Sequence, residues 1–198
     1  MVMTVLGARN EIDAFAMETI RAVHLLIKEN LDEQAMVLLY SAIDRLSWVN
    51  LANGDVESKD FCAWADKYIE PNENLGCTSK ELYAARCGIL HSGAAESRLS
   101  RETDCRELFY AYAEETKKII DEYFRVYHKR IHVISPSVLA GWFCIGAYTF
   151  SDEIEANCEN KQVYLERVKK WISFRTRGHV ITEMISSISE RTRLEDSE

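Results

Sequence analysis

Two side chains that together could do acid–base chemistry on a phosphate ester lie in the stretch ELYAARCGILHSG, residues 81–93. His91 can accept or donate a proton, because the reference pKa of imidazole, about 6.5, is close to cellular pH. Arg86, five residues earlier, stays charged, and its planar guanidinium suits phosphate oxygens. The spacing alone is a weak signal. In the structural alternative, Arg86 pairs with Glu81 or with a carboxylate of a neighbouring helix, and His91 caps the last carbonyls of its own helix.

Apolar residues at helical spacing predict that this pair lies near the end of a long helix in a bundle. Thr78 or Ser79 can cap that helix, and Gly93 can end it. Earlier helices are predicted over 11–28, from Asn30 or Asp32 to about Asn50, and over 58–69. Another long helix is predicted to begin at Ser100 and to bury a stripe running from Leu108 to Tyr123. The connections are short, so the first 130 residues are expected to form an antiparallel, four-helix-bundle-like domain.

The remainder, residues 131–198, is expected to be a helical extension packed on that domain. Pro136 begins a helix or an extended apolar segment, and amphipathic helices are predicted over 161–174 and 179–190. The apolar run 131–150 has no acidic residue, Lys or Arg, but Pro136 leaves too few residues on either side to span a bilayer, which takes about 20. No membrane association is expected.

Composition favours a globular helical protein. The chain has 198 residues, 47% of them hydrophobic and 28% charged, with only 2 prolines and 8 glycines, which suits one domain with a sizeable core. The 6 cysteines include no C-x-x-C pair, and Arg9, Glu11 and Asp13 interrupt any apolar leader. These features predict a protein of the reducing cytoplasm. The net charge of −8 means that any polyanion needs a local group of cations.

The stretch ELYAARCGILHS, followed by ESRLSR, resembles the HEPN superfamily, whose signature is an arginine, four to six residues and a histidine. SAIDRLSW (41–48) and DFCAWADKYI (60–69) also resemble one branch of uncharacterised bacterial HEPN-like proteins. The resemblance covers roughly residues 10–128. It implies an all-α fold, a homodimer and a metal-independent endoribonuclease, in many relatives a toxin or an antiviral defence protein with an antitoxin-like partner. Other relatives are catalytically inactive interaction modules.

The resemblance implies that Arg86 and His91 are the catalytic pair. RNA supplies its 2′-hydroxyl as nucleophile, so His91 would act as acid or base while Arg86 stabilises the phosphorane. Active relatives often have Asn, Asp or His after the arginine, and Cys87 is a poorer hydrogen-bond donor. Five residues turn an ideal helix by about 500°, which leaves the two side chains about 140° apart. Either a two-fold dimer or an unwound helix end at HSG would be needed to bring them together.

Two basic groups are further candidates for RNA contacts. Arg98, Arg101 and Arg106 follow the pair and could hold phosphates, although nearby acidic residues make a solvated helix start the alternative. The densest basic cluster is Arg167, Lys169, Lys170, Arg175, Arg177 and His179. Trp171 and Phe174 lie within it, as in proteins that bind single-stranded RNA. Their spacing of three instead favours burial of the rings beneath a charged outer face.

No cofactor or metal is expected. His128 and His132 are four residues apart, but no glutamate follows His128 as the H-E-x-x-H motif requires, and no third ligand is evident. Glycine-rich phosphate loops and G-x-S-x-G elbows are absent from the sequence. Two functions therefore remain: an HEPN-type endoribonuclease acting through Arg86 and His91, and a catalytically inactive helical interaction module.

Overall fold

The computed structural model describes residues 5–51, 54–92, 105–112, 114–126, 130–156 and 161–175. This part of the chain is mostly helical, with one small parallel sheet. In chain order, its elements are α1 (Val5–Lys28), α2 (Asp32–Val49), α3 (Ser58–Tyr68), α4 (Pro71–Asn74), α5 (Ser79–Ser92), β1 (Glu107–Tyr110), α7 (Glu114–Val126), β2 (Ile131–Ile134), α8 (Pro136–Ala156) and α9 (Lys161–Arg175).

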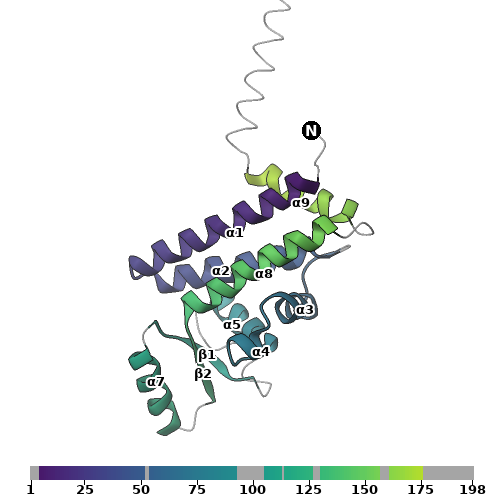
Figure 1. Ribbon diagram of the computed structural model, residues 1–198. Coiled ribbons are helices and arrows are strands. Elements are labelled where there is room, and N and C mark those ends of the chain that lie inside the picture. The colour runs from purple at the N-terminus through teal and green to yellow at the C-terminus, as the bar shows by residue number, and fades with distance from the viewer. Residues whose placement is uncertain are drawn as a thin grey trace, which may run out of the picture.

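Three long helices form the centre of the fold. Helices α2 and α8 run antiparallel to α1, while α3, α4 and α5 lie on one side of this layer and α9 crosses near the start of α1 (Figure 1). Large side chains from several helices, among them Trp64, Phe143 and Phe150, are fully buried and touch in one aromatic cluster. The segment expected to be an extension therefore contributes α8 to the same hydrophobic core as the first three helices.

Local sequence explains where the helix carrying Arg86 begins. The backbone N–H of Glu81 donates to the Thr78 hydroxyl at 3.1 Å, and the Thr78 N–H donates to the Glu81 carboxylate at 2.8 Å. This reciprocal capping box satisfies two of the amide groups that a helix start leaves without partners. It confirms Thr78 as the capping residue.

The helix predicted to start at Ser100 is wrong at residues 107–110, and residues 100–104 lie outside the described part of the chain. Residues 107–110 form β1, which pairs in parallel with β2, from Glu107 opposite Ile131 to Tyr110 opposite Ile134. The sequence ELFY is rich in aromatic residues, and its partner IHVI is rich in β-branched residues, which suit a pleated surface. The stripe expected to be buried is also partly exposed on α7: Ile119 is 70% and Tyr123 56% accessible.

Helix α7 connects the two strands and lies away from the central helices, at the lower left of Figure 1. Pro136 does begin a helix, since α8 starts there. Among the described helices, none is long and apolar enough to cross a membrane. The predicted helix 179–190 lies outside the described residues.

Candidate functional site

Arg86 lies in the middle of α5 and is held by a carboxylate of α2. Its Nε and Nη2 atoms donate to Asp44 Oδ2 at 2.8 and 2.6 Å, and the two side chains are only 20% and 18% exposed. Burial would lower the pKa of Arg86, but the hydrogen bonds and the charge of Asp44 outweigh burial and raise it. Of the structural alternatives considered from the sequence, the pairing with a neighbouring helix is therefore the one observed.

The neighbouring aromatic ring and thiol also touch Arg86. The Tyr83 ring centroid lies 5.7 Å from the Arg86 guanidinium carbon, and Nη1 lies 4.0 Å from Cys87 Sγ. The sulfur contact is long and weak, because sulfur is a poor hydrogen-bond acceptor. Asp44, not Cys87, is thus the group that orients the guanidinium.

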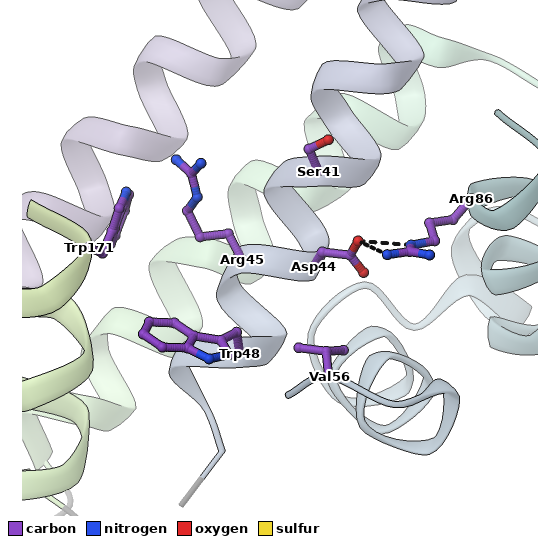
Figure 2. Close-up of a pocket in the computed structure, with 7 residues that line it drawn as sticks. All are labelled: Ser41, Asp44, Arg45, Trp48, Val56, Arg86 and Trp171. Atoms are coloured by element: carbon purple, nitrogen blue, oxygen red, sulfur yellow. Dashed lines mark hydrogen bonds and ion pairs between the residues drawn. The ribbon is translucent and has the colours of Figure 1, made fainter. Parts of the chain in front are cut away.

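Arg86 and Asp44 line a cavity of about 480 Å³ between α2, α5 and α9. Four residues of α2 line it together: Ser41, Asp44, Arg45 and Trp48. The rest of its lining is Val56, Arg86 and Trp171. Figure 2 shows Arg45 and Arg86 extending in different directions on either side of Asp44, so the cavity has one end near the indoles and another at the ion pair.

His91 lies in the last turn of α5, and its side chain is outside the described part of the structure. The helix continues to Ser92, so it does not unwind before His91. Unwinding there was one of the two ways in which Arg86 and His91 could have been brought together. At 100° per residue, the Cβ directions of Arg86 and His91 differ by about 140°. The backbone of a single α5 helix therefore directs positions 86 and 91 to different sides.

Arg106, the third predicted RNA contact, is held by Glu81. Its Nε and Nη2 donate to the two carboxylate oxygens at 2.7 and 2.9 Å, and Nη2 also donates to the Gly76 carbonyl at 2.8 Å. The backbone N–H of Arg106 donates to Glu81 as well, at 3.0 Å. These bonds attach the start of β1 to the start of α5. Arg98 and Arg101 lie outside the described residues.

The C-terminal basic cluster divides between the core and the surface. Trp171 is buried, as its spacing predicted, and Lys169 and Lys170 are exposed. Arg167 points inward: it is buried, donates to the carbonyl of Trp48 at 2.8 Å and lies 4.5 Å over the Trp48 ring. The other residues of this cluster lie beyond the described side chains.

Metal binding finds no support within the described ranges, where no group of three or more His, Cys, Asp or Glu residues could hold an ion. His132 instead places Nε2 2.7 Å from the Leu75 carbonyl, and His128 is not among the described residues. The sequence reasoning missed the α2 face at the cavity. A signal was present, because Ser41, Asp44, Arg45 and Trp48 follow the spacing i, i+3, i+4, i+7 that places residues on one side of a helix.

The chain was compared with protein-family models, with curated proteins and with solved structures, and none of them matches it.

Proposed function

We propose that this chain is a metal-independent endoribonuclease of the HEPN type, a cytoplasmic homodimer in which Arg86 and His91 act on the phosphodiester bond. The observation that carries the proposal is the position of Arg86. Its guanidinium is fixed by Asp44 at the edge of a 480 Å³ cavity, one and a half turns before His91 on the same helix. A pre-positioned cation is what the added charge of a phosphorane requires.

In the proposed reaction, the 2′-hydroxyl of RNA attacks the adjacent phosphorus atom and the bond to the 5′-oxygen breaks. The His91 imidazole takes the hydroxyl proton, and the imidazolium that forms returns a proton to the leaving 5′-oxygen. The products are a 2′,3′-cyclic phosphate and a 5′-hydroxyl. Neither a metal nor a cofactor takes part in this scheme. A toxin or defence role, with a small antitoxin-like partner, is the biological context that the family resemblance suggests.

A cleavage assay in the presence of a chelator tests the proposal. Wild type should cut a labelled, mixed-sequence RNA in EDTA and leave cyclic-phosphate ends. Arg86→Ala and His91→Ala should each reduce the rate about 100-fold or more, because general acid–base catalysis typically contributes 10²–10⁴-fold. His24→Ala and Arg125→Ala, changes at exposed positions on α1 and α7, are the matched controls and should cut at the wild-type rate.

The dimer can be tested by mixing the two inactive variants. If each site uses Arg86 from one subunit and His91 from the other, a heterodimer of Arg86→Ala and His91→Ala keeps one intact site. Random re-association should then restore about a quarter of the wild-type activity, since half of the dimers are mixed and each has one of two sites. No recovery, together with a monomer in light scattering, would contradict a shared site.

The second candidate is a catalytically inactive interaction module. It is favoured by the ion pair itself, because Asp44 already occupies two donors of Arg86, and by the thiol of Cys87 at the position after the arginine. In this case wild type and both variants show the same low background of cleavage. The assay above separates the two functions directly.

A further inference from the structure

Arg45, next to Asp44 on α2, is a half-buried cation without a counter-ion in the part of the chain that the structure describes. Its guanidinium carbon lies 5.2 Å from the Phe15 ring centroid and 5.6 Å from that of Trp171. Among the described residues, no carboxylate forms an ion pair with it. Burial lowers the pKa of Arg45, with no opposing effect from an acidic neighbour. The two rings hold the guanidinium in place, but they supply no anion.

The surroundings of Arg45 are short of negative charge. Asp44 is the one carboxylate among the seven residues that line the cavity, and it is paired with Arg86. Arg167, whose guanidinium carbon lies 4.5 Å from the Trp48 ring centroid, binds backbone carbonyls of Trp48 and Gly54 at 2.8 and 3.4 Å. The cavity lining thus combines two arginines and one carboxylate with two indoles, and a third arginine stacks on one of those indoles.

Asp44, which lines this cavity, has an unused acceptor. Asp44 Oδ1 is buried and has no hydrogen-bond partner in the described structure, because both bonds from Arg86 go to Oδ2. A buried acceptor without a donor is unfavourable, and a ligand N–H group would satisfy it. One nucleotide has a group for each of these residues. Its phosphate is an anion for Arg45, its planar base can stack on an indole, and a base N–H can donate to Asp44.

We propose that the cavity between α2 and α9 is a subsite for single-stranded RNA, in which Arg45 binds a backbone phosphate next to the bond cleaved near Arg86. The partly buried Trp48 is the stacking surface for a base, and the Asp44 carboxylate accepts from a base N–H. The inference rests on the proposed function in taking RNA as the ligand. It adds the path of the RNA strand, which would run from the ion pair along one face of α2 toward Trp171 (Figure 2).

The test uses a probe that cannot be cleaved, so that binding is separated from catalysis. The probe is a fluorescein-labelled, mixed-sequence octanucleotide of 2′-O-methyl RNA, followed by anisotropy over a range of salt concentrations. Arg45→Met removes the charge and keeps a side chain long enough to pack against the Phe15 and Trp171 rings. It should weaken binding about tenfold and reduce the slope of log Kd against log salt by about 0.7, the value for one phosphate of a single strand.

Two further variants control for charge and for folding. Arg125→Met removes an exposed cation from α7 and should leave both the affinity and the salt slope unchanged. Arg45→Lys keeps the charge and should restore the salt slope, even though lysine lacks the planar fork. If Arg45→Met has a lower melting temperature, the lysine variant still tests the charge in a folded protein.

Several outcomes would overturn the subsite: wild type that does not bind the probe, Arg45→Met with wild-type affinity and slope, or a polyglutamate peptide of equal charge that competes as well as RNA. The last result would indicate an acidic protein partner instead. Failure of the nuclease proposal can be distinguished from failure of the subsite proposal. Arg45-dependent binding without any cleavage of 2′-hydroxyl RNA would leave an RNA-binding module, whereas cleavage with an unchanged KM in Arg45→Met would remove only the subsite.

Discussion

Arg86 places two hydrogen bonds, from Nε and Nη2, on the single oxygen Oδ2 of Asp44, a residue 42 positions earlier in the chain. This arrangement differs from the two-oxygen fork of many arginine–carboxylate pairs, because Oδ1 is left without a hydrogen bond. The pair joins the middle of α2 to the middle of α5. Both residues are therefore fixed relative to the cavity that they line.

The first prediction concerns stability. Replacing either Asp44 or Arg86 by Ala leaves a part-buried charge without its partner, and we expect each change to lower the free energy of unfolding by about 1–3 kcal/mol. The double variant should lose less free energy of unfolding than the two single variants lose together, with a coupling energy of about 1–2 kcal/mol in urea unfolding. The exposed pair Glu122–Arg125 is the control and should show no measurable coupling, because solvent screens exposed ion pairs. Additive effects at Asp44 and Arg86 would contradict the ion pair.

The second prediction is that Asp44 positions Arg86 for cleavage. In the proposed nuclease, Asp44→Asn keeps an oxygen acceptor but removes the negative charge, so kcat should fall about tenfold with little change in KM. Asp44→Ala should lower kcat about 100-fold, because a small displacement of a catalytic group can slow a reaction by that factor. Gln34→Ala, a change at an exposed position near the start of α2, is the control and should retain kcat. A rise in KM with an unchanged kcat would show that Asp44 acts only through its proposed contact with the base and does not position the arginine.

The third prediction concerns acid stability through Glu81, whose carboxylate is only 5% exposed. Burial alone would raise the pKa of Glu81, but hydrogen bonds from Arg106 and from the Thr78 N–H outweigh it and lower the pKa from 4.5 to about 2. The folded state therefore binds the proton less tightly than the unfolded chain. Stability from this group is complete above about pH 5 and is lost as the pH falls toward 2.

Glu81→Gln tests this pH dependence. We expect the variant to be less stable at pH 7 by on the order of 2 kcal/mol and to show a smaller decline between pH 5 and pH 2 than wild type in urea unfolding. Arg106→Ala should also be destabilised at pH 7, because the buried carboxylate loses its main partner. Parallel pH profiles for wild type and Glu81→Gln would contradict the pKa shift.

Much of the helical part of the fold could be predicted from local sequence. The apolar spacing of 11–28 and of 161–174 corresponds to α1 and α9, and the Thr78-x-x-Glu81 box defines the start of α5. These features are local, since propensity, capping and one-sided burial act within a few residues. A single sequence is enough to show them.

The sequence-based predictions failed where a residue contacts a partner that is distant in the chain. Leu108 fits a helical stripe as well as a strand, and its assignment depends on β2, some twenty residues later. The Asp44–Arg86 pair likewise could not be chosen over a pairing with Glu81, because helix packing decides which carboxylate is near. The inward orientation of the Arg167 side chain depends on its hydrogen bonds to the backbone carbonyls of Trp48 and Gly54. No local pattern encodes these contacts.

The fourth prediction tests the close approach of α8 to α3. A Cβ added at Gly146 would lie 2.5 Å from the backbone carbonyl oxygen of Tyr68, a contact that requires backbone movement. Gly146→Ala should lower the free energy of unfolding by about 2 kcal/mol or more, in spite of the better helix propensity of alanine. Gly141→Ala, one turn and a half earlier on α8, meets nothing within 4 Å and should be neutral or stabilising by up to about 1 kcal/mol. Equal effects at the two glycines would mean that α8 does not pack against Tyr68.

The fifth prediction concerns the buried contact that attaches β1 to α2. The hydroxyl oxygens of Tyr40 and Tyr110 lie 2.6 Å apart, and burial is the largest factor that raises the pKa of each phenol, so both stay protonated at neutral pH. Tyr40→Phe or Tyr110→Phe leaves the remaining hydroxyl without its partner and should cost about 1–2 kcal/mol. The double variant removes both polar groups together and should be no less stable than either single variant. Urea unfolding of the four proteins measures this. If Tyr110→Phe is neutral, residues 107–110 do not pack against α2 as a strand, whereas a non-additive pair confirms the contact between two segments 70 residues apart in sequence.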